Sequence, residues 1–252
     1  MKARRIGPAT QPEVLVARLT DRVRVPEVMD QPGLDPAAHA LALAGLRRIN
    51  ALCRSDAILW PPLCDLARRL APAPVRVLDI ATGSGDVPIR LWRRFQQAGL
   101  RAEIVGCDMS SLAIGQARDG AARAGAAVQF FEGDVLAAPL AGEYDAVMCS
   151  LFLHHLDPPE VAIVLARMAA AARHLVVVND LRRCTAGWWA AYVGTRLLSR
   201  SPVVHYDGPV SVAAAFTPAE AVAMAEGAGL RGAMATTRWP GRFLLKWERS
   251  PV

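Results

Sequence analysis

The feature that most constrains the fold of this chain is a strand that runs directly into a glycine-rich turn, in the stretch VRVLDIATGSGD at residues 75–86. Val75–Ile80 form a nearly continuous apolar run, which is typical of a parallel strand covered on both faces. Glycines in the turn at residues 82–85 let the backbone bend tightly and approach a ligand closely. Pro88 then opens a segment with helical spacing. The stretch predicts a strand, a turn and a helix N-terminus with free N–H groups.

A second acidic residue indicates what this turn binds. The next apolar run, EIVGCD, ends at Asp108, where a carboxylate can accept hydrogen bonds from both hydroxyls of a ribose. Together the turn and Asp108 predict a nucleoside-binding site, and the alternative is a turn that only connects strand and helix. A dinucleotide site of the G-x-G-x-x-G type is disfavoured, because its third glycine would fall at Pro88.

At these residues the sequence resembles the class I S-adenosylmethionine (SAM) methyltransferases, whose motif is an acidic residue followed by spaced glycines. Here the motif reads Asp79, Ala81, Gly83, Gly85. Ala81 replaces the commoner glycine, and this variant resembles the methyltransferases of ubiquinone and menaquinone biosynthesis. A narrower resemblance, to bacterial methyltransferases that accompany type III polyketide synthases and act on phenolic products, rests on Trp60 and on the stretches GLRRIN, NDLRR and LLSRSPVVHYDGPVSV.

The resemblance implies that the cofactor is SAM, with S-adenosylhomocysteine (SAH) as product, and that successive strand ends hold it. Asp134 in EGDV would accept a hydrogen bond from the adenine amino group, and the alternative is a solvated turn aspartate. Ser150 would border the methionine end. The full set of expected cofactor residues is Asp79, Ala81, Thr82, Gly83, Ser84, Gly85, Asp108, Met109, Asp134, Val135 and Ser150.

Two adjacent histidines are the candidates for the chemistry. A sulfonium methyl group is already activated, so the protein has to position the reactants and remove one proton from the acceptor. His154 and His155, in LFLHHL, are the candidate bases, and Asp180 at the end of a later strand would orient the imidazole. Local packing of the histidine pair is the alternative. A zinc site is disfavoured because no cysteine or carboxylate lies at ligand spacing, so no metal is expected.

The acceptor is expected under residues 181–216, an insertion rich in aromatic and apolar residues. Such a cover favours a small aromatic or lipid-like acceptor, and O-methylation of a phenol in secondary metabolism is the first hypothesis. C-methylation of a quinone precursor and a non-catalytic methyltransferase-like binding protein are the alternatives. The expected acceptor-binding residues are Trp188, Tyr192, His205 and Tyr206, and these rings could equally fill the core.

The remaining pattern alternates strands and helices and ends in a hairpin around Pro240. It predicts a Rossmann-like α/β class I methyltransferase fold, with a seven-stranded, mostly parallel sheet, one antiparallel edge strand and helices on both faces. Two helix starts are marked by capping boxes, at Asp157 and Thr217. Strands are expected at 103–108, 127–132, 144–150 and 174–180, and helices at 36–55 and 60–71; the methyltransferase domain would be 36–252, with cap helices within 36–71.

The distribution of charge and the spacing of cysteines indicate which partners and which cellular compartment to expect. The net charge of +6 is concentrated in residues 1–25, so the body of the chain shows no basic face for nucleic acid. We expect residues 1–35 to be a disordered arm, an over-called start before Met29 or, alternatively, a transit peptide. The five cysteines are scattered singly, and no apolar run is long enough to span a bilayer. A soluble cytoplasmic protein without membrane insertion is expected, and a homodimer is left open.

Overall fold

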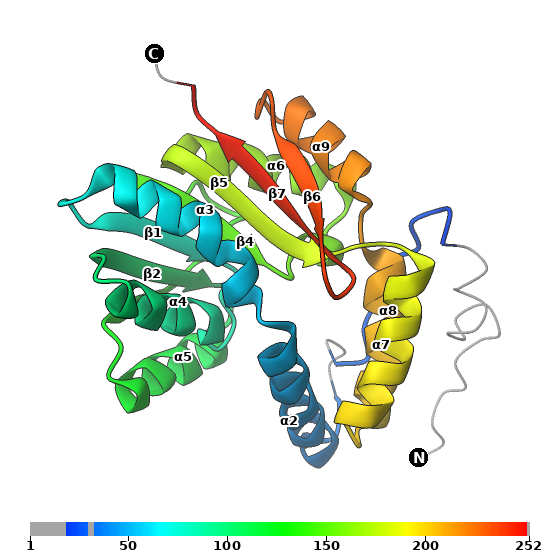
Figure 1. The fold of residues 1–252 in the computed structure, drawn as a ribbon. Coiled ribbons are helices and arrows are strands. Elements are labelled where there is room, and N and C mark those ends of the chain that lie inside the picture. Colours follow the sequence, from blue (N-terminus) through cyan, green and yellow to red (C-terminus); the bar gives the residue numbers. More distant parts are fainter. Residues whose placement is uncertain (1–18, 30–32, 251–252) are drawn as a thin grey trace.

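The structure is a computed structural model, and it describes residues 19–29 and 33–250 (Figure 1). Its centre is a seven-stranded sheet with the order β3-β2-β1-β4-β5-β7-β6. The strands are β1 Val75–Ile80, β2 Ala102–Asp108, β3 Val128–Glu132, β4 Tyr144–Ser150, β5 Ala172–Leu181, β6 Met234–Arg238 and β7 Arg242–Glu248. The chain therefore has the predicted α/β class I methyltransferase fold.

The C-terminal hairpin sets the direction of the last two strands. Strands β1 to β5 pair in parallel, whereas β7 is antiparallel to both β5 and β6. The reversed strand is therefore β7, one place in from the edge, and β6 forms the edge itself. The reason is the tight turn around Pro240, which sends β7 back into the position beside β5.

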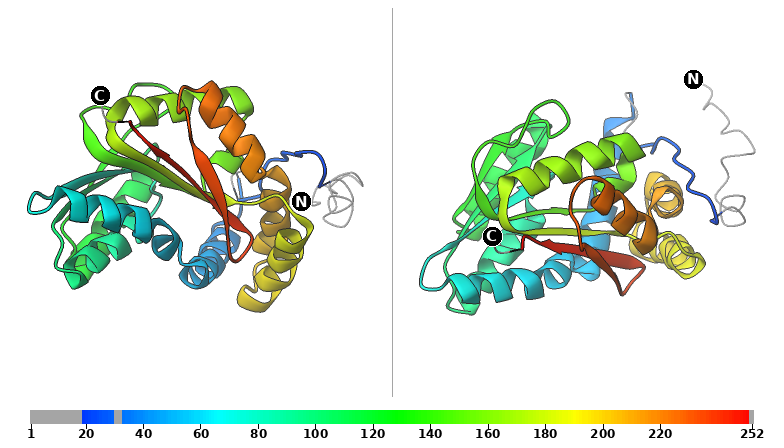
Figure 2. Two further views of the ribbon diagram at one scale, coloured as in Figure 1. Left: turned by 45° about the horizontal axis from the view of Figure 1, so that its top comes forward. Right: turned by 90° about the horizontal axis from the view of Figure 1, so that it is seen from above.

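Helices cover both faces of the sheet, as expected for a largely parallel sheet (Figure 2). One set of strand side chains, including Leu78 and Val147, packs against α6 and α9. The alternate set, including Val77 and Met148, packs against α3 and α4. The helices of these layers are α3 Ser55–Leu70, α4 Asp86–Gln97, α5 Ser111–Ala124, α6 Pro158–Ala171 and α9 Pro218–Gly227.

Three further helices stand beyond the carboxyl ends of the strands, beside the sheet rather than on its faces (Figure 1). They are α2 Pro36–Cys53, α7 Thr185–Leu198 and α8 Pro202–Ala214, and they contact one another. The expected cap helices correspond to α2 and α3, although α3 starts at Ser55 and not at residue 60, directly after Arg54, which has a left-handed φ of 43°. Both capping boxes form as predicted, at the starts of α6 and α9.

The described part of the N-terminal segment, residues 19–29, makes specific contacts with the rest of the protein. The guanidinium of Arg22 donates to the carbonyl oxygens of Ala214 (2.6 Å), His154 (3.0 Å) and Leu156 (2.7 Å). Asp207 accepts hydrogen bonds from the backbone N–H groups of residues 28 (2.8 Å) and 29 (3.0 Å). Residues 19–29 of the expected arm therefore lie against the body of the protein, because carbonyl groups left free at turns and helix ends accept hydrogen bonds from Arg22. Residues 1–18 and 30–32 lie outside the described part of the chain.

Two further observations concern the cysteines and the possibility of a membrane-spanning helix. All five cysteines are unpaired, in keeping with their scattered positions. Within residues 19–29 and 33–250, no helix combines the length and apolar character needed to cross a membrane.

Candidate active site

The glycine turn after β1 combines a packed side with an open one. A Cβ added to Gly85 would lie 2.8 Å from the ring of Phe130 and 2.9 Å from the Cβ of Ala117, so close packing requires glycine there. Gly83 has a φ of 56° and nothing within 4 Å of its Cβ position. Ala81 also has a positive φ, 52°. The turn is therefore anchored on the α5 side and leaves open space at Gly83, which is the shape a ligand cradle needs.

Asp79, at the carboxyl half of β1, is a buried and incompletely paired carboxylate. The hydroxyl of Thr82 donates to its Oδ2 (2.6 Å), whereas its Oδ1 has no hydrogen-bond partner among the described residues. Burial raises the pKa of Asp79 to about 7, and the hydrogen bond from Thr82 opposes that shift. A carboxylate of this kind favours a positively charged or hydrogen-bond-donating ligand nearby.

Asp108 is tied to the glycine turn by backbone hydrogen bonds. Its Oδ2 accepts from the N–H of Gly83 (2.8 Å) and its Oδ1 from the N–H of Ser110 (2.9 Å). Each carboxylate oxygen can accept a further hydrogen bond, so the half-buried side chain is oriented and still able to hold a diol. Met109 beside it is 71 % exposed, which is unusual for so large an apolar side chain.

The other expected cofactor residues lie at neighbouring strand ends. Asp134 is exposed, and its Oδ1 accepts from the N–H of Leu136 (2.7 Å), which is the geometry of a turn aspartate with its second oxygen left over. Val135 is buried. Ser150 Oγ accepts from the Nδ2 of Asn179 (2.9 Å). Ser84 Oγ lies 3.3 Å from a carboxylate oxygen of Asp86. All these residues border the carboxyl edge of the sheet, as open α/β sheets require.

The structure brings His154 and Asp180 together. The imidazole Nδ1 lies 2.6 Å from Asp180 Oδ1, and the N–H of His154 donates to Asp180 Oδ2 (3.1 Å). Both side chains are buried, at 5 % and 1 % exposed. Because Nδ1–H donates to the carboxylate, Nε2 is the nitrogen left to accept a proton. His154 sits in the short helix η2 Leu153–His155, directly after β4.

The two histidines differ strongly in basicity. Burial lowers the pKa of His154, but the charge of Asp180 and its hydrogen bond more than offset this, so the net shift is upward from 6.5. Burial, together with the charge of His154, lowers the pKa of His155 to about 4. Asp180 has its pKa held below the usual value by His154, against the effect of burial. Of the pair, His154 is therefore the stronger base and already has an orienting carboxylate.

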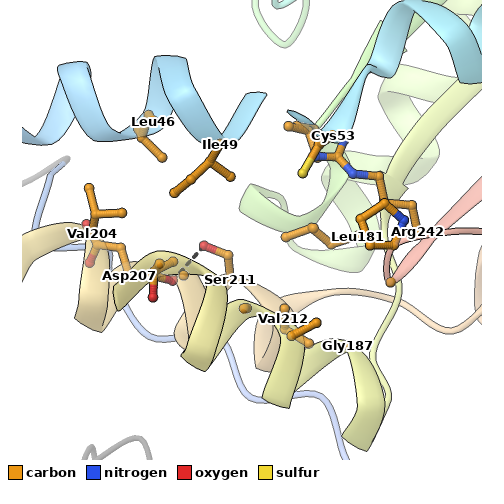
Figure 3. A pocket seen from close by; sticks show the side chains of 18 of the residues that line it. Leu46, Ile49, Cys53, Leu181, Gly187, Val204, Asp207, Ser211, Val212 and Arg242 are labelled. Atoms are coloured by element: carbon orange, nitrogen blue, oxygen red, sulfur yellow. Dashed lines mark hydrogen bonds between the residues drawn. The ribbon is translucent and has the colours of Figure 1, made fainter. Parts of the chain in front are cut away.

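A cavity of about 560 Å³ opens beside this pair, enclosed by α2, α7, α8 and the β6–β7 turn (Figure 3). Leu46 and Ile49 of α2 lie across it from Val204 of α8. Apart from Leu198, the α7 side is lined by small residues at helical spacing, which leaves the cavity its volume. These α7 residues are Gly187, Ala190, Ala191, Gly194, Thr195 and Leu198.

The four aromatic and histidine residues expected to bind the acceptor do not line this cavity. Trp188 is 1 % exposed and stacks on Tyr192, with ring centroids 5.1 Å apart. His205 bonds through Nε2 to the carbonyl of Ser199 (2.8 Å), and Tyr206 packs against a cluster that includes Val210. Residues 188 and 192 fall on a different face of α7 from residues 187, 191 and 194, because the helical repeat is 3.6 residues.

Sequence reasoning missed two contributions to the cavity. Glu27 and Met29 reach it from the N-terminal segment, and Arg242 reaches it from β7. In the sequence, only the spacing of small residues on α7 indicates a cavity. Glu27, Met29 and Arg242 give no such signal, because they come from segments far apart in the chain. Glu27, His154 and His155 each offer a ligand atom, and these atoms lie within 4.8 Å of one another, so the described residues include one group able to hold a metal ion. Glu27 lies far from the two histidines along the sequence, but folding brings it beside them from the N-terminal segment.

Comparisons with known proteins point to methyltransferases. Residues 77–174 match the family of methyltransferase domains. The demethylmenaquinone methyltransferase of Thermus thermophilus is 38 % identical over 117 residues, 46 % of this chain and 50 % of that protein. The ubiquinone biosynthesis O-methyltransferase of Xanthomonas axonopodis pv. citri is 28 % identical over 171 residues, 66 % of each chain. The match thus spans about half the length of the Thermus relative.

Solved structures show the same fold. The SAM-dependent methyltransferase SibL, in its apo form, superimposes with a TM-score of 0.67 at 17 % identity, covering 97 % of this chain and 71 % of that one. The plantazolicin methyltransferase BamL, in complex with a triazolic desmethylPZN analog and SAH, gives a TM-score of 0.64 at 16 % identity, covering 94 % of this chain and 97 % of that one. At such identities the likeness is one of fold.

Proposed function

We propose that this protein, whose residues 77–174 match a methyltransferase domain, transfers a methyl group from SAM to a small aromatic acceptor, with a phenolic oxygen as the favoured target. The observation that carries the proposal is the buried His154–Asp180 pair lining a largely apolar cavity. The relatives that act in quinone biosynthesis and the neighbour bound to SAH support the same chemistry.

The residues around the glycine turn fit SAM. The open position at Gly83 admits the cofactor, and Asp108 can accept hydrogen bonds from the ribose hydroxyls. Asp79 has a buried Oδ1 that no described residue pairs with, so it can accept from a charged donor. Asp134 would accept from adenine with its second oxygen, and Ser150 would border the methionine end. When bound, SAM supplies a methyl group that its sulfonium has already activated.

The chain's own residues supply the proton transfer. His154 removes the hydroxyl proton of the acceptor at Nε2, and Asp180 holds Nδ1–H and stabilises the imidazolium that results. The apolar walls of α2, α7 and α8 exclude water and orient the ring of the acceptor. O-methylation is favoured because a phenol at neutral pH still carries the proton that such a base removes.

The decisive experiment is turnover of SAM labelled in its methyl group with a panel of alkylresorcinols, chromones and quinol precursors. Label in an ether product supports the proposal, and label on a ring carbon would instead assign C-methylation. Binding of SAM without turnover of any acceptor would favour a non-catalytic binding protein. We further propose a role in secondary metabolism and, from the five unpaired cysteines, a cytoplasmic location.

The ribose assignment predicts a cofactor defect for Asp108→Ala. The variant should bind SAM about ten- to hundredfold more weakly, because hydrogen bonds to a charged acceptor contribute about 1.5–3 kcal/mol. Isothermal titration calorimetry measures this directly. Asp119→Ala, at an exposed position of α5, is the matched control and should bind as the wild type does. Unchanged SAM affinity in Asp108→Ala would show that this carboxylate does not bind the ribose.

The buried carboxylate of Asp79 predicts a pH-dependent affinity for SAM. Its pKa is about 7 in the free protein, and a bound cation lowers it, so binding releases a proton below pH 7. Affinity should therefore rise with pH up to about 7 and then level off, by at most about tenfold per pH unit. Because the folded pKa is raised, the free energy of unfolding of the unliganded protein should fall as pH rises from 4 to 7.

Asp79→Asn is the matched test, since the amide has the same shape and does not titrate. Calorimetry from pH 5 to 8 should then show a nearly flat affinity profile for the variant. A slope equal to that of the wild type would show that another group titrates on binding.

A further inference from the structure

Arg242 is a buried cation that forms no ion pair with any of the described residues. It opens β7, is 2 % exposed, and its Nη1 donates to Ser55 Oγ (3.0 Å). Its Nε is buried without a partner, and no carboxylate lies within 4 Å of its guanidinium among residues 19–29 and 33–250. Buried charges in proteins are nearly always paired, because an unpaired one loses its hydration without compensation. The guanidinium of Arg242 can therefore bind a negatively charged group of a ligand.

The surroundings add to the positive potential at this point. Ser55 is the first residue of α3, a helix of 16 residues whose N-terminus carries a partial positive charge. The one acid in that first turn, Asp56, is already engaged by Arg94 (2.7 Å) and Arg90 (3.8 Å). The nearest acid in the helix is thus neutralised and does not serve Arg242.

The guanidinium also borders the acceptor cavity. Figure 3 shows Arg242 at the end of the cavity where Cys53 and Leu181 lie, and His154 lines the same space. The residues of the glycine turn and Asp108 do not line it. A ligand in this cavity therefore meets mostly apolar walls, the imidazole of His154 and the guanidinium of Arg242. The carboxylates of Glu27 and Asp207 also line it, and they accept hydrogen bonds from Ser211 and from the backbone of residues 28 and 29.

We propose that Arg242 binds a carboxylate of the acceptor, so that the acceptor is an aromatic hydroxy acid with an apolar body. The inference rests on the proposed function for its reaction and adds the substrate class. The carboxylate pairs with the guanidinium, the ring lies between α2 and the small-residue face of α7, and the hydroxyl reaches His154.

Matched acceptors that differ only by the acid group provide the test. Orsellinic acid is compared with orcinol, and olivetolic acid with olivetol, by calorimetry in the presence of SAH, so that binding is measured without turnover. The wild type should bind each acid at least about thirtyfold more tightly than its decarboxylated partner, as expected for a desolvated ion pair. Arg242→Gln should lose that preference, and Arg238→Gln, an exposed arginine of the same hairpin, should keep it.

Two further readouts separate this role from others. Without ligand, Arg242→Gln should melt at the temperature of the wild type or above, because it removes an unpaired buried charge, and SAH should bind unchanged. A clear fall in SAH affinity would overturn the proposal by assigning the guanidinium to the carboxylate of the cofactor. Equal loss for acids and neutral partners, or no preference in the wild type, would also overturn it. Acids that bind tightly but are never methylated would leave the anion site intact and refute only the proposed function.

Discussion

His154→Ala is expected to lower kcat by about 10² to 10⁴, the usual contribution of a positioned general base, while SAH affinity stays close to that of the wild type. The imidazole is held by Asp180 at 2.6 Å and lines the acceptor cavity, so its loss removes proton transfer without disturbing the glycine turn. Single-turnover rates with labelled SAM measure the chemical step. If the single-turnover rate and its pH dependence are unchanged in His154→Ala, the acceptor ionises without this base.

The pH profile identifies the base. Because the pKa of His154 is raised above 6.5, the wild-type rate should fall with decreasing pH through a value above 6.5, as the imidazole takes up a proton. In Asp180→Asn the charge that raises this pKa is gone and burial remains, so the acidic limb should move to lower pH and the maximal rate should drop. His155→Ala is the neighbouring control, since its pKa of about 4 makes it a weak base. A dead His155→Ala variant with an active His154→Ala variant would reverse the assignment.

Removal of residues 1–28 is expected to destabilise the protein and to impair turnover. The truncation deletes Arg22, which donates to three carbonyl groups next to the active site, and Glu27, which lines the cavity. Hydrogen bonds from a charged donor contribute about 1.5–3 kcal/mol, and a domain of this size changes its Tm by about 2–4 °C per kcal/mol. A fall in Tm on the order of 5 to 10 °C is expected in thermal unfolding.

Two single substitutions test whether Arg22 carries this effect. Arg22→Ala should reproduce much of the loss of Tm, because its bonds to His154, Leu156 and Ala214 are partly buried. Arg24→Ala removes an exposed pair with Asp157 and an exposed hydrogen bond to the carbonyl of His155, and it should shift stability by less than about 1 kcal/mol. A truncated protein with wild-type Tm and turnover would show that the segment contributes neither stability nor a wall of the cavity.

The fold follows closely from local sequence patterns. The apolar run at Val75–Ile80 and the glycines after it predicted the first strand and its turn, and β4 was predicted to the residue. Capping boxes at Asp157 and Thr217 predicted the starts of α6 and α9. These signals are local, because a strand, a cap or a tight turn is decided by residues within a few positions of one another.

The acceptor site follows less well, since it depends on contacts between distant segments. The proximity of His154 to Asp180 could be predicted because neighbouring parallel strands end at one edge of the sheet. The rotation of α7 about its axis could not, and it turns Trp188 away from the cavity while Gly187 faces it. Aromatic composition indicates that a segment is buried and not which face of a helix meets the ligand.

The sequence by itself thus determined the sheet, the glycine turn and the acidic strand ends, because each rests on short-range patterns. Only the tertiary structure decided that Glu27 joins the histidines, that Arg22 and Asp207 hold the segment 19–29, and that Arg242 is buried without an ion pair to any described residue. The reason is physical: the pairing of a buried charge is settled by everything that surrounds it, and those groups come from segments far apart in the chain.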